Sequence, residues 1–296
     1  MMTFRTLWIF CCLLLTRPAL GQARYTGLVG SAAVDVSLID YPDSTVEAVY
    51  TYTRFNTPIA LKGSYKQGIL RLVERNERGK ATATMTVSGF APASQTVAGT
   101  WKNLATGQQL PLTLTRVLAA EPLPEASAAS RELLQVASLP NSYFKVVLTG
   151  NPDDSGSQLT AIRLLDKKTN RLVQQVPVDC QSRGLRSVAT GDFNFDGYPD
   201  FSVFESSYAG PNTSSLYFLY NPATKRYKDS GFAGTSLEFD DRKKRVYEHN
   251  SCCAGTSVMN AEYKVVRNRM VLVAQHCYRW DDKKQELVER KPSACQ

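Results

Sequence analysis

Apolar and polar side chains alternate with a period of two through the first half of the chain. This alternation is rich in Val, Thr and Tyr, which is typical of half-buried β-strands. Turn signals such as "YPDS", "NERGK" and "ATGQQ" separate the alternating runs. The runs are "VEAVYTYTR" (46–54), "ILRLVE" (69–74), "KATATMTV" (80–87) and "LPLTLT" (110–115). The pattern predicts an N-terminal domain over residues 24–117, a meander of roughly eight antiparallel strands with no helix.

The alternation stops after this domain. Residues 118–138 read "LAAEPLPEASAASRELLQVAS", in which Ala, Pro, Ser and Glu take over. Such a composition predicts a linker over residues 118–140, with a short helix at "SRELLQ".

Strand patterns return from Tyr143 onward, in four similar units. Each unit has an apolar or aromatic pair, then Asp or Asn, then a basic polar turn and a second strand. The units are "LLDKKTNRLVQQ" (164–175), "FLYNPATKRYKD" (218–229), "LEFDDRKKRVYEHN" (237–250) and "YRWDDKKQELVER" (278–290). They predict β-hairpin tips of one antiparallel sheet, in a second domain over residues 141–296, with their basic side chains in water. The expected fold is therefore all-β, with two antiparallel β domains joined by a linker.

The N-terminus has the pattern of a secretory signal. Arg5 precedes the apolar run "LWIFCCLLL" (7–15), and "RPALGQA" (17–23) follows with a proline and small residues. The run is too short to cross a bilayer, which takes roughly 20 residues. We therefore expect a signal peptide over residues 1–21, cleaved from an exported protein of the periplasm or the medium that has no transmembrane segment.

The charge balance is basic, with a formal net charge of +8. This favours solubility and anionic partners such as cell-wall polymers. The sequence has no basic block interleaved with aromatic residues, so nucleic acid is not an expected partner.

Five cysteines would remain after cleavage, all in the second half of the chain. In an exported protein they predict up to two disulfides with one cysteine left over. The vicinal pair is not expected to bond to itself, and one or both of its members are expected to reach another cysteine. A zinc site is a weaker interpretation because no C-x-x-C pair is present. The disulfide candidates are Cys180, Cys252, Cys253, Cys277 and Cys295.

The stretch "GDFNFDGYPD" (191–200) spaces oxygen-bearing side chains two residues apart and then turns on Gly197. Calcium takes six to eight such hard oxygen ligands, and glycine lets the backbone reverse between them. Val203 stands where an EF-hand loop has its bidentate glutamate, and strand patterns flank the stretch on both sides. We therefore expect a strand-flanked calcium loop of the FG-GAP kind. Its ligands would be Asp192, Asn194, Asp196, the carbonyl of Tyr198, and Asp200.

An alternative needs no metal. Asp and Asn side chains readily bond to their own backbone in turns, and an Asx-rich turn would explain the same composition. Crowded carboxylates repel one another without a cation, which favours calcium.

A small-residue loop, "SSYAGPN" (206–212), follows the next strand. Gly and Pro allow a stiff protruding turn, and a rigid tyrosine is a common interface anchor. The alternative is an ordinary hairpin loop with a half-buried tyrosine. The candidate target-binding residues are Ser206, Ser207, Tyr208, Gly210 and Asn212.

Taken together, the "NFDGYPD" loop, the strand, "YAGPN" and "LYFLYNPATKRY" resemble a known module over residues 143–289. It is the C-terminal module of exported bacterial proteins akin to invertebrate-type lysozyme inhibitors. This group includes calcium-binding immunity proteins that neutralise lysozyme-like effectors delivered by type IV secretion. The resemblance implies a β fold that inserts a loop into the glycan cleft of a muramidase, with Ca²⁺ bracing that loop. Those inhibitors present a Ser-Gly-x-x-Tyr type of loop, whereas this chain has "SSYAGPN".

No enzyme signature stands out. The chain has two histidines, His249 and His276, and none of the common hydrolase, zinc-protease or nucleotide-binding fingerprints. A pair of carboxylates acting on a glycoside stays open. We expect a protein that is not an enzyme, either an inhibitor or immunity factor against a lysozyme-like muramidase, or a calcium-stabilised binding module for cell-wall glycan or another surface partner.

Overall fold

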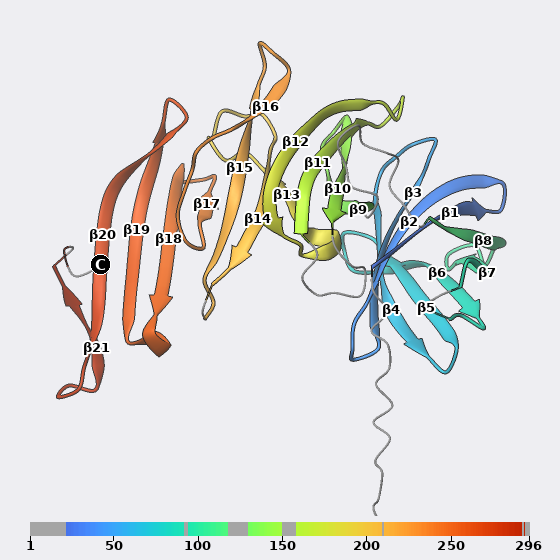
Figure 1. Cartoon of the computed structure of the whole chain (residues 1–296), viewed down its shortest axis with the longest axis horizontal. Helices are drawn as coiled ribbons and strands as arrows, with labels where there is room; N and C mark the ends of the chain where they lie inside the picture. The colour runs from blue at the N-terminus through green and yellow to red at the C-terminus, as the bar shows by residue number, and fades with distance from the viewer. Residues whose placement is uncertain are drawn as a thin grey trace, which may run out of the picture.

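A closed barrel and three open sheets follow one another along the computed structural model of the chain (Figure 1). The structure describes residues 22–91, 94–117, 130–149, 158–208, 210–291 and 293. Apart from the one-turn 3-10 helices η1 (Gly184–Arg186) and η2 (Cys253–Gly255), all elements of these residues are strands. No helix in this described part is both long and apolar enough to cross a membrane. The predicted all-β fold is confirmed; the proposed signal peptide, residues 1–21, lies outside the described residues.

The N-terminal domain is an antiparallel meander that closes on itself. Its strands are β1 (Ala23–Val29), β2 (Ala32–Asp40), β3 (Thr45–Tyr52), β4 (Ile59–Lys66), β5 (Ile69–Arg75), β6 (Ala81–Ser88), β7 (Thr96–Asn103) and β8 (Gln109–Val117). The meander of eight strands was predicted. Closure was not: β1 pairs with β8 from Arg24 opposite Val117 to Val29 opposite Leu112, which leaves the barrel without a free edge.

The barrel interior is filled by the inward-facing members of the alternating strands. Tyr25, Leu61 and Leu112 are each at most 2% exposed and belong to one apolar cluster. Gly63 lets β4 and β5 approach closely, because a Cβ there would lie 1.8 Å from the carbonyl oxygen of Arg71. The barrel therefore has a packed core.

The second half consists of three meandering sheets. The first has β9 (Arg131–Ser138), β10 (Ser142–Thr149), β11 (Gln158–Asp166) and β12 (Leu172–Gln181). The second has β13 (Val188–Gly191), β14 (Asp200–Ser207), β15 (Thr213–Asn221) and β16 (Arg226–Asp229). The third has β17 (Glu238–Asp240), β18 (Arg245–Cys252), β19 (Ser257–Val266), β20 (Arg269–Asp281) and β21 (Glu286–Arg290).

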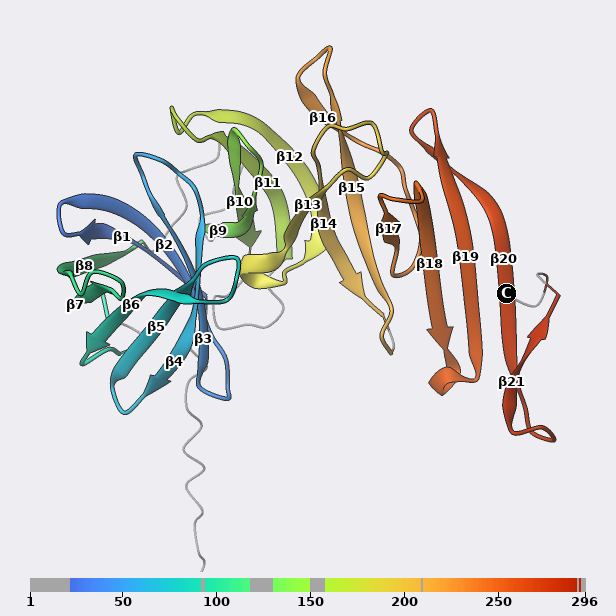
Figure 2. The same ribbon diagram turned by 180° about the vertical axis from the view of Figure 1, so that it is seen from behind.

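These sheets are arranged side by side, as the views from both sides show (Figures 1 and 2). The first and second share an apolar cluster in which the rings of Phe144 and Phe201 lie 5.2 Å apart. The second and third meet around Phe193, Tyr217 and Phe239. Each sheet therefore obtains part of its burial from its neighbour.

The four predicted units are indeed hairpin tips, and they share one turn. In each, an Asp or Asn side chain accepts the N–H groups two and three residues ahead, and the fourth residue ahead has a positive φ. The turns join β11 to β12 at Asp166, β15 to β16 at Asn221, β17 to β18 at Asp240, and β20 to β21 at Asp281. The expectation of one sheet is wrong. Residues 182–187 and 230–237 are connections outside the strand pairing, and a new sheet begins after each of them.

Part of the predicted linker is a strand. β9 occupies the segment where a short helix was expected, and residues 132–135 are all buried. Leu133 packs in the apolar cluster of the first and second sheets, whereas Leu134 packs in a cluster that includes Ile39 and Val49 of the barrel. A strand that is buried on both faces shows no alternation, which is why the pattern was missed. Residues 118–129 of the linker lie outside the described residues.

A buried ion network joins the barrel to the first sheet. Asp35 of β2 accepts hydrogen bonds from Arg24 at 2.9 Å and from Lys145 of β10 at 2.7 Å. Glu132 of β9 accepts from Arg24 at 3.3 Å and also pairs with Arg163 of β11. Asp35 is 6% and Glu132 4% exposed, so these charges depend on one another for compensation.

Candidate functional site

The proposed calcium loop lies between β13 and β14, and its side chains bond to the loop backbone. The two carboxylate oxygens of Asp192 accept the N–H groups of Asp196 at 3.0 Å and Gly197 at 2.8 Å. Gly197 has a φ of 90°, a conformation that favours glycine. The loop therefore turns where the sequence predicted it would.

The remaining polar groups of the loop continue this pattern. Asn194 Oδ1 accepts the N–H of Asp196 at 3.2 Å, and Asp196 Oδ1 accepts the N–H of Tyr198 at 2.9 Å. The amide nitrogen of Asn194 also donates to Asp196 Oδ2 at 2.7 Å. These are the bonds of an Asx-rich turn. Within the described residues no three His, Cys, Asp or Glu side chains form a group that could hold a metal ion.

The donor set is nevertheless of the kind calcium takes. Each carboxylate or amide oxygen has two lone pairs, so one accepted N–H bond leaves further capacity. Asp192, Asn194 and Asp196 all present hard oxygen atoms within five residues, and the Tyr198 carbonyl follows. In chemistry and spacing, these four residues fit calcium.

Asp200 has a different position from the other proposed ligands. Its side chain is fully buried at the start of β14, and its two oxygens accept the N–H of Phe193 at 3.0 Å and of Tyr220 at 2.8 Å. Burial raises the pKa of this carboxyl to about 6, against the lowering effect of the two N–H bonds. Asp200 therefore ties the loop to β15, a bracing role that the spacing alone did not indicate.

The loop also contacts the third sheet. Asn194 donates to Asn268 Oδ1 at 3.0 Å in the β19–β20 turn, and the ammonium of Lys244 lies 5.2 Å from the centre of the Phe195 ring. Asn268 and Lys244 were not predicted, because they lie far from the loop in sequence and belong to ordinary polar turns. Through these contacts the loop joins the second and third sheets.

The candidate target loop connects β14 to β15 and exposes its tyrosine. Tyr208 is 55% exposed, which fits both a binding loop and the alternative of an ordinary hairpin loop. Its N–H donates to the Asn212 carbonyl at 2.9 Å and closes the turn. The Ser206 and Ser214 hydroxyls lie 3.0 Å apart, and their interaction with the phenol of Tyr208 lowers its pKa.

Asn212 is an anchor of this loop. It is 6% exposed, and its side chain makes two bonds to the backbone of Ser251 in β18. Asn212 Nδ2 donates to the Ser251 carbonyl at 2.8 Å, and Asn212 Oδ1 accepts the Ser251 N–H at 3.0 Å. A third bond, from Asn212 Nδ2 to Asn250 Oδ1, measures 3.0 Å. The prediction that Asn212 faces a target is wrong, since this side chain is used inside the protein; Gly210 is exposed beside it.

The two loops lie at opposite ends of β14, which runs from Asp200 to Ser207 (Figure 1). At ~3.3 Å per residue this strand separates them by roughly 23 Å. Direct bracing of the target loop by calcium, as the resemblance implied, is therefore wrong. The clamp from Asn212 to Ser251 braces the loop instead.

The cysteines are arranged differently from the prediction. Cys277 is disulfide-bonded, Cys180 is a buried free thiol, and Cys252 and Cys253 are exposed free thiols. The vicinal pair cannot reach Cys277, because β19 runs between β18 and β20 and two strand spacings amount to roughly 9.5 Å. Cys295 lies outside the described residues.

Both histidines pair with neighbours on the third sheet. His249 Nδ1 lies 2.7 Å from Asn260 Oδ1, and His276 Nδ1 lies 2.6 Å from Glu289. Both are exposed. Their positions are those of surface strand residues.

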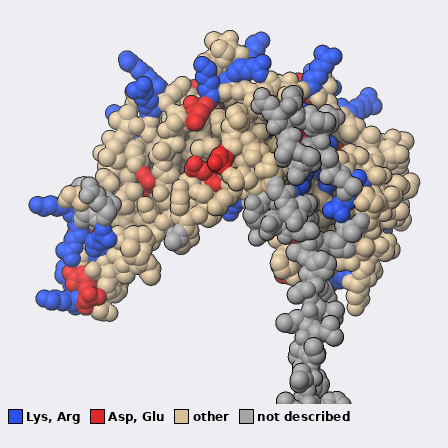
Figure 3. Space-filling view, in the orientation of Figure 1, with Lys and Arg blue, Asp and Glu red and all other residues tan. Residues whose placement is uncertain are grey.

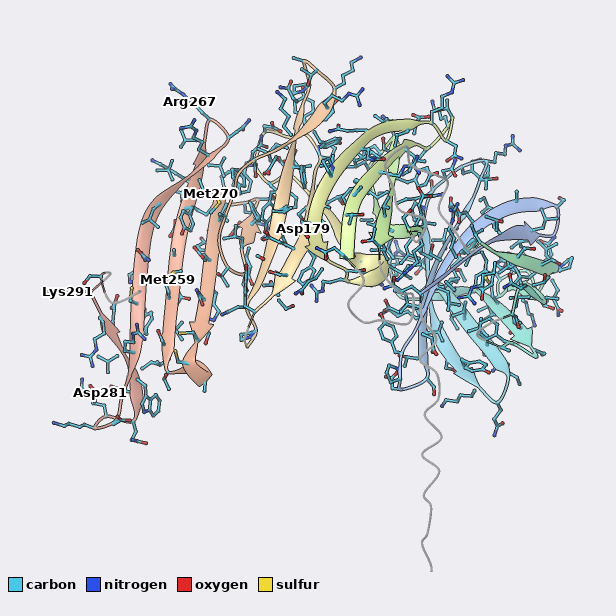
Figure 4. All side chains as sticks on the ribbon, in the orientation of Figure 1. Asp179, Met259, Arg267, Met270, Asp281 and Lys291 are labelled. Carbon is cyan, nitrogen blue, oxygen red and sulfur yellow. The ribbon has the colours of Figure 1, made fainter. Side chains whose placement is uncertain are left out.

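Lysine and arginine side chains project along the upper, convex side of the molecule (Figure 3). Several come from the hairpin turns, where Lys168, Lys225, Arg242 and Lys243 are exposed. Figure 4 places Arg267 at this end of the third sheet and Asp281 at the opposite end. The proposed calcium loop lies on this basic side, and a further group of Lys and Arg side chains lies at the lower left (Figure 3).

Comparison with known proteins assigns no family to the chain. No known protein family matches the sequence, and no curated protein does. Among solved structures, the chain is similar to one described as the structure of a Xanthomonas type IV secretion system related protein. The two share 10% identity with a TM-score of 0.27, over 91% of this chain and 99% of the other.

Proposed function

We propose that this protein is an exported inhibitor or immunity factor that blocks a lysozyme-like, peptidoglycan-cleaving enzyme with the β14–β15 loop. The observation that carries the proposal is an exposed Tyr208 on a loop whose base is clamped by Asn212. Tyrosine is enriched among the residues that contribute most to binding at protein interfaces. The weak likeness to a type IV secretion related protein plays no part in this proposal.

The loop suits a cleft. Its tip residues, Tyr208, Gly210 and Pro211, are exposed, so the tyrosine projects without bulky neighbours in the described part of the loop. The ring would stack in a sugar subsite, and the phenol would reach polar groups of the enzyme. Because the clamp fixes the base of the loop before binding, less conformational entropy is lost on association.

In this proposal calcium acts as a structural brace, without a catalytic role. Asp192, Asn194, Asp196 and the Tyr198 carbonyl would hold the ion, with Asp200 tying the loop to β15. A bound cation would relieve the repulsion between the carboxylates and stiffen the contact from Asn194 to Asn268. Its effect on the β14–β15 loop would be indirect, through the packing of the second sheet against the third.

Substitution of Tyr208 tests the proposal. A panel of muramidases would be captured on the mature protein, and lysis of cell walls would then be measured with the captured enzyme. Tyr208→Ala is expected to weaken inhibition by about 30-fold or more, as for a hot-spot residue worth at least about 2 kcal/mol. Tyr208→Phe separates the phenol from the ring.

The matched control is Tyr41→Ala, which removes a tyrosine that is 38% exposed on the barrel and should leave inhibition unchanged. Unfolding midpoints of all variants are measured alongside. Full inhibition by correctly folded Tyr208→Ala would rule out this loop as the inhibitory element.

A second function is favoured by the basic hairpin turns. Their exposed lysines and arginines would suit an anionic cell-wall polymer, which makes the protein a glycan-binding module of the envelope. Retention on purified peptidoglycan that disappears at moderate salt, with no muramidase captured, would support this function over inhibition.

A further inference from the structure

The end of β18 brings two exposed thiols together. The Sγ atoms of Cys252 and Cys253 lie 3.0 Å apart, and both thiols are free. Neighbouring residues of a regular strand point to opposite faces, so two adjacent thiols on one side require a break in the strand. Cys253 supplies that break with a φ of 56°.

The turn that follows is strained. Ala254 has φ 55° and ψ 36°, so two successive residues with a Cβ adopt the left-handed conformation, and Gly255 continues it at φ 82°. Such a conformation is unfavourable for a residue with a Cβ and persists only where its surroundings hold it. Thr256 does so, because its N–H and its hydroxyl donate to the Cys253 carbonyl at 3.2 and 2.7 Å. The turn thereby fixes the position of the thiols before any bond forms between them.

The surroundings also make one thiol more reactive than the other. Hydrogen bonds from Cys253 and Ser257, together with the charge of Arg279, lower the pKa of Cys252. The hydrogen bond and charge of Cys252 raise the pKa of Cys253 in turn. A thiolate beside a thiol is the arrangement that thiol–disulfide exchange uses. Cys180 offers an internal contrast, since burial raises its pKa to about 11.

The pair adjoins the clamp of the candidate target loop. The Asn212 side chain hydrogen-bonds both the N–H and the carbonyl of Ser251. That carbonyl belongs to the peptide bond between Ser251 and Cys252. Any change in the backbone angles of Cys252 therefore reorients a group that holds the loop. Gly210 lies close to the same carbonyl, with its Cβ position 3.8 Å away.

We propose that Cys252 and Cys253 are a redox-modification site that closes to a vicinal disulfide and locks the clamp on Ser251. The oxidant is a protein disulfide of the exported compartment. The Cys252 thiolate attacks one sulfur of that disulfide and forms a mixed disulfide, releasing one oxidant thiolate. Cys253 then loses its proton and attacks the Cys252 sulfur, releasing the second. The released thiolates take up protons, so two electrons and two protons pass to the oxidant.

Closure restrains the backbone between the two α-carbons, and with it the Ser251 carbonyl. The oxidised protein holds the β14–β15 loop more tightly than the reduced protein. The modification rests on the export that the proposed function also assumes, but it does not depend on the inhibitory role, whereas any effect of closure on inhibition rests on that role.

A tryptic digest tests the modification directly. Cleavage after Arg245 and Lys264 releases peptide 246–264, which contains Cys252 and Cys253 and no other cysteine. Protein recovered from the exported compartment and alkylated without reductant should give this peptide unalkylated and two hydrogens lighter than the reduced form. After reduction it should carry two alkyl groups. Double alkylation without reductant, or a cross-link to another peptide, would overturn the proposal.

Hydrogen exchange tests the coupling to the loop. The Tyr208 N–H, bonded to the Asn212 carbonyl, should exchange at least about tenfold faster in reduced than in oxidised protein. The double variant Cys252→Ser, Cys253→Ser should exchange at the faster rate and should not respond to reductant, although Cys277 keeps its reducible disulfide. Equal exchange in oxidised and reduced wild type would refute the lock. A clear redox response without inhibition of any muramidase would leave this site standing and refute the proposed function.

Discussion

The barrel and the three open sheets bury apolar surface in different ways. The barrel closes β1 on β8 and encloses its own core, so it has no free edge and needs no neighbour for its interior. The open sheets end in edges, and their clusters are shared between successive sheets. The third sheet lacks a described neighbour on one side and leaves Val271, Leu272 and Val273 40%, 51% and 48% exposed. Closure therefore makes one domain self-sufficient, while each open sheet depends on the next.

Both candidate sites lie at contacts between the second and third sheets. The proposed calcium loop joins the second sheet to the third through Asn194 and Asn268, and the candidate target loop joins them through Asn212 and Ser251. Loops on a rigid scaffold commonly carry function. Here the loops also serve as contacts between sheets, so their rigidity and the stability of the stack are linked.

Matched core substitutions should give the largest effect and separate the two regions. Phe201→Ala removes a fully buried ring that packs against Phe144, Phe218 and Tyr227, and is expected to lower the free energy of unfolding of the sheets by about 4 kcal/mol. Leu61→Ala, in the barrel, is expected to lower that of the barrel by about 3 kcal/mol.

Tryptophan fluorescence during urea unfolding distinguishes the regions, because Trp101 lies in β7 and Trp280 in β20. Variants with a single remaining tryptophan report one region each. Phe201→Ala should shift the Trp280 transition and leave that of Trp101 in place, and Leu61→Ala should do the reverse. Coincident shifts would mean that barrel and sheets unfold as one unit, contrary to this comparison.

Acid should weaken the junction between the two regions. Burial alone would raise the pKa of Asp35, but Arg24 and Lys145 outweigh it and hold the pKa below its ordinary value. The stabilisation is therefore complete above the unfolded pKa of about 3.9 and is lost as pH falls through the lower folded pKa. Asp35→Asn should lose about 3 kcal/mol at neutral pH, at the low end for breaking a buried pair because the amide oxygen still accepts.

The measurement is the difference in unfolding free energy between wild type and Asp35→Asn from pH 7 to pH 2. That difference should shrink below about pH 4, because the carboxyl of the unfolded chain takes up its proton there while that of the folded protein does so only at lower pH. Asp282→Asn, at an exposed turn, is the control and should stay within about 0.5 kcal/mol of wild type throughout. A difference that does not change with pH would show that charge at Asp35 contributes nothing to the junction.

Whether a strand could be predicted from the sequence depended on how many of its faces are buried. The barrel strands have one face exposed to solvent, so alternation revealed them, and the hairpin tips were marked by an Asp or Asn followed by a basic polar turn. Strand β9 is buried on both faces and resembled a linker. The closure of β1 on β8 depends on strand curvature and on close approaches such as that at Gly63, which carry no periodic signal.

The sites divide in the same way. The spacing of Asp192, Asn194 and Asp196 indicated a turn rich in oxygen ligands, and the exposed tyrosine was found in the loop where it was expected. Contacts between distant segments were not readable: Asn212 turns inward to Ser251. The paired thiols depend on a left-handed Cys253, a conformation for which cysteine gives no sequence signal.

Calcium should produce the smallest of these effects, confined to the open sheets. If the loop binds as weakly as extracellular modules, calcium at 10 to 100 times its dissociation constant would stabilise the folded state by about 1.4 to 2.7 kcal/mol. The Trp280 transition should therefore move to higher temperature in calcium than in chelator, while that of Trp101 stays fixed. Asp196→Ala should abolish the difference.

Asp241→Ala is the control, because it removes an exposed carboxylate from the neighbouring β17–β18 turn and should retain the response. Magnesium distinguishes specific calcium binding from general screening of charge, because both ions have the same charge. Magnesium demands a smaller octahedral site, so it should stabilise the protein less than calcium at equal concentration. Equal midpoints of the Trp280 transition in calcium and in chelator would contradict calcium binding. The hydrogen bonds of Asp192 and Asp196 would then be enough to explain the conformation of the loop. An equal shift of the Trp101 transition would instead show that the ion acts away from this loop, because no residue of the loop belongs to the apolar core of the barrel.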